Sequence, residues 1–181
     1  MDARKKFALR KAEEIVSQRN GPNYGKLILI PALITLAITL LRLGAELLDL
    51  PAWLANRQPG GLGAIMGISW LPPFLGIYFA YKLADAPGRL WKNLFKALFL
   101  YGLAARIPVI AIMGLAIYGN WGTHYDAFAP GVMTDTSPMV RFLQGGVMVQ
   151  LVWWLMIWTV GSGMLTGLCT SFIRSRRSPK A

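Results

Sequence analysis

The chain has 181 residues, 55% of them apolar, with a mean hydropathy of +0.45 and a formal net charge of +11. Its length suits one domain, whereas its apolar share exceeds that of an ordinary soluble protein. The charge does not indicate a nucleic-acid partner, because the basic residues cluster beside apolar runs instead of spreading along one face. The single cysteine, Cys169, excludes an intrachain disulfide.

The N-terminal segment, residues 1–24, is predicted to form a cytoplasmic basic amphipathic helix. Apolar residues recur at helical spacing among basic ones, which is typical of a helix lying on an anionic lipid surface. A solvated tail is the alternative. The sequence Asn-Gly-Pro-Asn at 20–23 should end any such helix before the first membrane span.

Four apolar runs follow, and each is close to the roughly 20 residues that cross a bilayer. We therefore expect an all-α integral membrane protein, with a four-transmembrane-helix antiparallel bundle over residues 25–173. The predicted spans are about 26–49, 62–82, 94–118 and 142–173, followed by a cytoplasmic basic tail at 174–181.

The distribution of Lys and Arg predicts the orientation of these spans. Fifteen of the nineteen lie before the first span, between residues 82 and 96, or after the fourth span. Both termini should therefore be cytoplasmic, with the links 50–61 and 119–141 outside a membrane such as the bacterial inner membrane. Interfacial tryptophans fit this orientation: Trp53 and Trp121 at outer ends and Trp91 at an inner end.

The uncharged part of the first span covers only residues 27–41, so Arg42 and Glu46 should enter the membrane. They stand one helical turn apart on the same face, and we expect a mutual ion pair that either neutralises an enclosed charge or forms part of a polar pocket. A signal peptide is the competing interpretation of such a short run. It is disfavoured because Leu43 stands where its cleavage site requires a small residue.

The second span contains Pro72 and Pro73 near its midpoint. The two missing N–H donors leave the carbonyls of Ile68 and Ser69 without helical partners, so this span should be bent or broken. If the helix restarts near Pro72, its positive end would face the membrane midplane and suit an anionic group. A plain kink is the alternative.

Arg106 falls near the middle of the third span. Inserting an arginine at that depth costs roughly 2.5–3.5 kcal/mol, so something should compensate its charge. The candidates are a salt bridge to Glu46 or Asp49 on the first span, or an anionic ligand. Pro108, two residues later, predicts a kink in the same helix.

The outer link carries the only histidine of the chain, followed by Tyr125 and Asp126. Glycines and aromatic residues around it predict a cap loop that folds back onto the bundle. One histidine cannot supply a bis-histidine haem site or a two-histidine metal site, so we predict no cofactor, no metal and no catalytic residue. Asp126 could instead orient His124 as a general base, but no obvious nucleophile accompanies them, and a hydrogen-bonded turn is the simpler interpretation.

The fourth span combines small residues with a run of tryptophans. Gly163 and Gly167 repeat the spacing of Gly63 and Gly67, which permits close helix contact within the bundle or at a dimer face. Trp154 and Trp158 share a face, where they could pack internally, contact lipid or line a ligand pocket.

Together these features predict a protein that binds or transports a small anionic or lipid-like ligand at an outward-facing intramembrane polar site. The predicted ligand-binding residues are Arg42, Glu46, Arg106, His124, Tyr125 and Asp126. Expected partners are membrane lipids, the anionic ligand and further protein copies or subunits in a homo- or hetero-oligomer, but no nucleic acid. The alternatives are a non-catalytic subunit or assembly factor of a membrane complex, and a membrane-embedded enzyme that uses His124 and Asp126.

Overall fold

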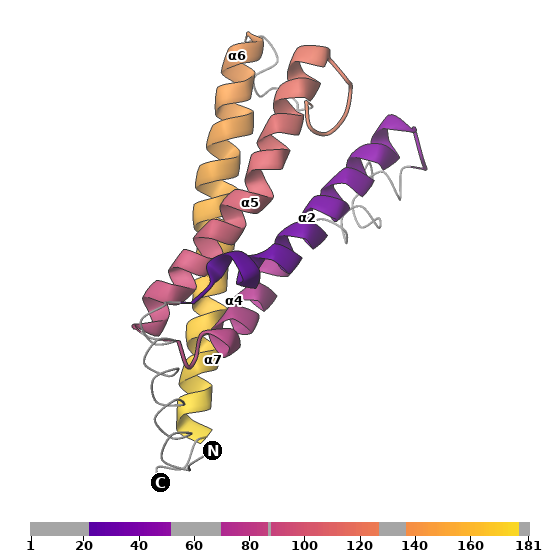
Figure 1. Ribbon diagram of the computed structural model, residues 1–181. Helices are drawn as coiled ribbons and strands as arrows, with labels where there is room; N and C mark the ends of the chain where they lie inside the picture. The colour runs from indigo at the N-terminus through magenta and orange to yellow at the C-terminus, as the bar shows by residue number, and fades with distance from the viewer. Residues whose placement is uncertain (1–21, 52–69, 87, 127–136, 178–181) are drawn as a thin grey trace, which may run out of the picture.

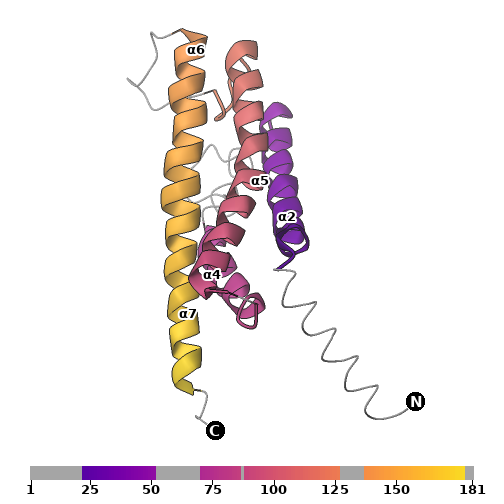
Figure 2. The ribbon, with the colours of Figure 1, turned by 60° about the vertical axis from the view of Figure 1, so that its left-hand side comes forward.

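The computed structural model describes residues 22–51, 70–86, 88–126 and 137–177, and every regular element within them is a helix (Figure 1). In chain order these elements are α2 (Tyr24–Leu47), α4 (Leu71–Lys82), α5 (Leu90–Gly119), α6 (Pro138–Arg141), η2 (Phe142–Ser162) and α7 (Gly163–Arg177). The last three follow one another as a single long rod, which runs opposite to α5 in Figures 1 and 2.

Several predicted features lie outside the described residues. These are the N-terminal amphipathic helix, Trp53 and its link, the first part of the second span with Gly63 and Gly67, the loop residues 127–136, and the tail from residue 178.

Three of the described helices are long and apolar enough to cross a membrane: Tyr24–Leu47, Leu90–Gly119 and Pro138–Arg176. By length and composition these helices support a membrane protein and suggest that its chain crosses the membrane more than once. The described part of the second predicted span, α4, has 12 residues. At 1.5 Å per residue it extends roughly 18 Å, less than the roughly 30 Å of a hydrocarbon core, so a fourth span is not shown.

Local sequence explains where these helices begin and continue. The Asn23 side chain accepts a hydrogen bond from the Lys26 amide at 3.1 Å and so caps α2. Helix α4 begins at Leu71 and has Pro72 and Pro73 in its first turn. Backbone N–H groups in a first turn have no acceptor within the helix, so the prolines cost no helical hydrogen bond there. Helix α5, by contrast, continues as one element through Pro108.

Helix α5 holds the described bundle together, because α2, α4 and η2 all pack against it (Figure 2). The main core forms where α4 meets α5 and the middle of the rod. Its most buried members are Phe79, Leu83, Leu94, Leu98, Tyr101 and Leu155. A smaller cluster of Val109, Ile112, Met113, Ala116 and Tyr125 lies toward the other end of α5.

The central part of the rod, η2, is wound as a π-helix, in which backbone hydrogen bonds join residues five apart. Its buried positions recur every four or five residues along the winding: Gly145 and Gly146, Gln150, Leu155, and Thr159 and Val160. The winding therefore brings Gln150 onto the packed face, although the residues around it are apolar.

Glycines allow α4 and α7 to approach each other closely. A Cβ atom placed on Gly167 would lie 2.7 Å from the Gly76 carbonyl oxygen and 2.6 Å from a methyl group of Leu94. A Cβ on Gly163 would meet the Leu98 side chain at 2.6 Å. The Gly163 and Gly167 pair thus serves packing within the chain, one of the two uses predicted for it.

Candidate functional site

The end of α2 meets the turn that follows α5 through one imidazole. His124 Nδ1 contacts Glu46 Oε1, and the His124 backbone N–H donates to Glu46 Oε2 at 2.8 Å. On the other side of the ring, Arg42 Nη2 lies 3.3 Å from His124 Nε2. We call Arg42, Glu46 and His124 the α2–turn cluster. Glu46 is only 4% exposed, so the cluster places its carboxylate inside the protein.

The partners assign the tautomer of His124. A carboxylate only accepts and a guanidinium only donates, so Nδ1 carries the proton toward Glu46 and Nε2 accepts from Arg42. The ring is neutral in this arrangement and lies between two opposite charges. The predicted direct ion pair between Arg42 and Glu46 is therefore replaced by contacts of both side chains with His124.

Tyr125 anchors the same turn beside the cluster. Its side chain is 5% exposed, its hydroxyl donates to the Thr39 carbonyl at 3.4 Å, and its ring lies 3.8 Å from the imidazole of His124 between centroids. Burial raises the pKa of the Tyr125 hydroxyl to about 12, with Arg42 opposing the shift and Glu46 adding to it. Tyr125 thus remains a neutral hydrogen-bond donor at physiological pH.

Asp126 shapes the turn and does not orient His124. One of its carboxylate oxygens accepts from the Gly122 N–H at 2.9 Å, and the other accepts from the Thr123 N–H and hydroxyl. Its backbone carbonyl in turn accepts from Arg141 Nη2 at 2.6 Å. The carboxylate that contacts His124 is Glu46, so Asp126 does not orient the imidazole and instead forms the hydrogen-bonded turn that was the simpler interpretation.

Arg106 lies in a second polar group, on the side of α5 that faces η2. Its Nη1 donates to Gln150 Oε1 at 3.4 Å, and its guanidinium carbon lies 5.1 Å from the ring centroid of Trp154. The side chain is 9% exposed, and its Nε is buried without a hydrogen-bond partner. We call Arg106, Gln150 and Trp154 the Arg106 cluster.

Helical geometry explains why Arg106 does not face the first span. Tyr101, on the same helix, points to α2 and shares a hydrogen bond with Thr35 at 2.8 Å. Arg106 is five residues further along, which at 3.6 residues per turn places it roughly 140° around the helix from Tyr101. Among the described residues no carboxylate pairs with Arg106, so the predicted salt bridge to Glu46 or Asp49 is not formed.

Gln150 is the residue that sequence reasoning missed. It accepts from Arg106, and its Nε2 lies 3.5 Å from the sulfur of Met113, a contact that completes its role as a buried polar link. A lone glutamine inside a long apolar run was the available signal. The structure thus divides the predicted site into the α2–turn cluster with Tyr125 beside it, Asp126 as a support of the turn, and Arg106 on another face.

Within the described ranges, no group of three or more His, Cys, Asp and Glu side chains is placed to hold a metal ion. Comparisons with protein-family models, curated proteins and solved structures found no match. The chemistry of the two clusters therefore carries the functional argument.

Proposed function

We propose that this protein binds a small anionic or anion-bearing, lipid-like ligand within the membrane, with Arg106 as its main contact. One observation carries this proposal: a guanidinium that is 9% exposed has a glutamine and an indole as its partners, but no described carboxylate. Neutral partners satisfy some of its N–H groups but leave its charge uncompensated. An isolated buried charge is expensive, and an anion would supply the missing counter-charge.

The remaining donors of Arg106 support an oxyanion as the ligand. A guanidinium presents five N–H donors in a planar fork that matches carboxylate and phosphate groups. The Nη1 of Arg106 is partly used by Gln150, whereas its Nε has no acceptor. Trp154 stacks against the guanidinium and offers an apolar surface beside the charge, which suits a ligand with both anionic and apolar parts.

We further propose a topology of four spans with both termini in the cytoplasm, based on the distribution of Lys and Arg in the sequence. In this orientation the α2–turn cluster lies at the outer end of the bundle, and the 120–126 turn caps it. Arg42, whose buried Nε lacks a partner, provides a second donor on the outer route to the site. Movement of this cap would convert binding into transport.

Native mass spectrometry of the full-length protein, released gently from membranes, tests the proposal. We expect a retained anionic species in the wild type, its loss in Arg106→Gln, and partial recovery in Arg106→Lys, which keeps the charge. Arg89→Gln is the matched control, because Arg89 carries the same charge on the exposed start of α5. Added phosphatidylglycerol and inorganic phosphate, used as probes, distinguish a lipid headgroup from a free anion.

Other outcomes point to the alternatives. A stoichiometric protein partner with a carboxylate against Arg106, and no retained anion, would contradict the proposal and favour a subunit or assembly factor. An enzyme using His124 requires its Nε2 as a base, yet this atom already accepts from Arg42. If the wild type showed hydrolytic turnover and a folded His124→Ala variant did not, the result would support a membrane-embedded enzyme.

A further inference from the structure

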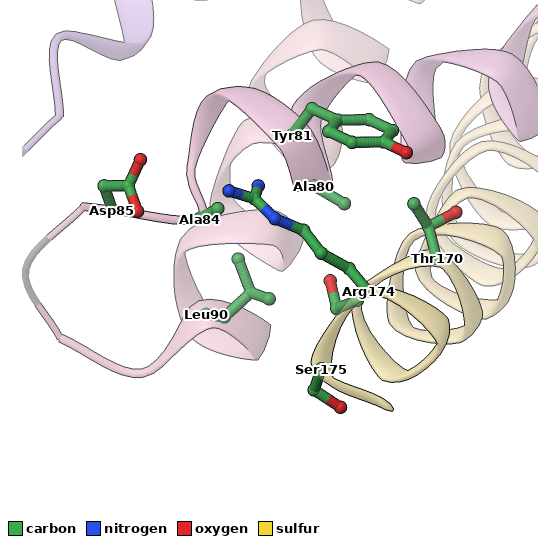
Figure 3. A pocket seen from close by; sticks show the side chains of 9 residues that line it. Ala80, Tyr81, Ala84, Asp85, Leu90, Thr170, Arg174 and Ser175 are labelled. Carbon is green, nitrogen blue, oxygen red and sulfur yellow. The ribbon is translucent and has the colours of Figure 1, made fainter. Parts of the chain in front are cut away.

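A separate cavity of about 250 Å³ opens at the opposite end of the bundle from the α2–turn cluster. The end of α4 and its following turn, the start of α5 and the last turns of α7 surround it (Figure 3). The start of α5 and the last turns of α7 are ends of helices that are long enough to span a membrane, so we place the cavity near the boundary between lipid and water. Its volume is below the roughly 300–1,000 Å³ of sites for drug-sized molecules and suits a headgroup-sized group.

Two opposite charges line this cavity from different elements. Asp85 lies in the turn after α4, and Arg174 extends from α7 with its guanidinium toward the side of the cavity that Asp85 occupies (Figure 3). The nearest aromatic partner of Arg174 is the ring of Tyr81, 5.8 Å from its guanidinium carbon. Within the described part of the chain, neither Asp85 nor Arg174 forms a salt bridge with the other or with a third residue.

The hydroxyl groups of the cavity add acceptors. Thr170 donates to the Thr166 carbonyl at 2.7 Å and Ser171 to the Gly167 carbonyl at 3.0 Å, so their protons are used within α7. Their oxygen lone pairs remain available to a ligand. The cavity therefore offers one strong donor, Arg174, opposite several acceptors, of which Asp85 is the strongest.

The remaining lining consists of the apolar residues Ala80, Ala84 and Leu90 and of Ser175, whose hydroxyl donates to the Phe172 carbonyl at 2.8 Å. Phe172 and Ile173, on the same helix as Arg174, are more than half exposed. A recess lined by charged, hydroxyl and apolar side chains, on a helix with exposed apolar residues, fits an amphiphile better than a fully polar solute.

We infer that this cavity binds a zwitterionic phosphate group with a primary ammonium, of the phosphoethanolamine type, at the membrane surface. The phosphate pairs with Arg174, and the ammonium donates to Asp85 and the hydroxyl oxygens. A trimethylated ammonium has no N–H to donate to these acceptors, and a purely anionic headgroup would meet the Asp85 carboxylate. The inference is independent of the proposed site at Arg106, because the two sites share no residue.

The test is a competition between lipids with identical acyl chains on the full-length protein, read by native mass spectrometry. We expect phosphatidylethanolamine to be retained over phosphatidylcholine by roughly tenfold, the effect of one hydrogen bond to a charged group. Asp85→Asn and Arg174→Gln should each remove this preference. Arg176→Gln is the matched control, since Arg176 is exposed on the same helix and does not line the cavity.

Equal retention of the two lipids by the wild type, or a preference unchanged in both cavity variants, would overturn the inference. A preference for phosphatidylglycerol that strengthens in Asp85→Asn would also overturn it, because the cavity would then be an anion site. Displacement of the lipid by soluble phosphoethanolamine would support the same chemistry with a soluble source. Failure of displacement, with the lipid preference intact, would support the lipid as the source.

Discussion

The α2–turn cluster and the Arg106 cluster each contain an arginine whose Nε is buried, but they balance its charge in different ways. In the α2–turn cluster the imidazole of His124 contacts both Arg42 and Glu46, so a positive and a negative side chain face the same ring. In the Arg106 cluster the described partners are neutral. The first arrangement contains both a positive and a negative side chain and suits a structural lock, whereas the second lacks a described counter-charge and suits a ligand site.

Glu46→Gln should have the largest effect on stability, because it removes the only negative charge of the α2–turn cluster and keeps the side-chain shape. Hydrogen bonds to a charged group contribute about 1.5–3 kcal/mol, and Glu46 accepts two from His124, so we expect a loss of about 3 kcal/mol in the free energy of unfolding. Thermal unfolding in detergent, followed by circular dichroism, measures the loss. Asp85→Asn is the control, because Asp85 is an exposed carboxylate. An equal loss of stability in Asp85→Asn and Glu46→Gln would remove the distinction between the two clusters.

Gly102→Ala should disturb the Arg106 cluster and leave the α2–turn cluster intact. The added Cβ would collide with the Leu155 side chain, which is 2% exposed, and would push η2 with Gln150 and Trp154 away from α5. Overpacking of this kind costs roughly 1–3 kcal/mol, and retention of the anionic ligand should fall with it.

The matched control for Gly102→Ala is Gly44→Ala, between Arg42 and Glu46 on α2. A Cβ there meets no atom within 4 Å. In a helix interior this change should raise stability by roughly 0.5–1 kcal/mol and leave ligand retention unchanged. Unchanged retention in Gly102→Ala, despite the loss of stability, would contradict the placement of the ligand at the α5–η2 contact.

Alkaline pH should weaken the α2–turn region through Tyr125. Its pKa in the folded protein, about 12, exceeds the value of 10.0 for an unperturbed tyrosine. Because this pKa is raised on folding, the neutral hydroxyl contributes to folding stability. This contribution is complete below pH 10 and is lost as the pH rises through about 12. Between pH 9 and pH 11, the free energy of unfolding of the wild type should therefore fall by about 1 kcal/mol more than that of Tyr125→Phe. Equal losses in chemical-denaturant titrations would show that Tyr125 ionises freely.

Arg106→Met should change stability least. The substitution removes an uncompensated buried charge, which favours folding, but it also leaves the oxygen of Gln150 without its donor. The two effects oppose each other, and we expect a net change within about 1 kcal/mol in ligand-free protein. If Arg106→Met lost as much stability as Glu46→Gln, Arg106 would have a structural counter-charge. This result would contradict the difference drawn between the two clusters. Thermal unfolding of both variants side by side decides this.

The membrane class of the protein and the place of Arg106 near the middle of a long apolar helix followed from the sequence alone, because hydropathy acts over whole runs of residues and does not depend on neighbouring helices. The same reasoning located α2, α5 and the long rod within a few residues of their observed ends. It also placed Arg42 and Glu46 on one face of α2, a consequence of helical periodicity.

Partner choice was decided by the tertiary structure. Glu46 was predicted to pair with Arg42 or Arg106, but the turn after α5 brings His124 onto it across 78 residues of sequence. Arg106 was predicted to face α2, but the rotation of α5 and the π-winding of η2 give it Gln150 and Trp154 instead. A hydropathy pattern specifies how deep a side chain lies, whereas its direction depends on how the helices rotate and pack, which becomes defined only when their surfaces meet.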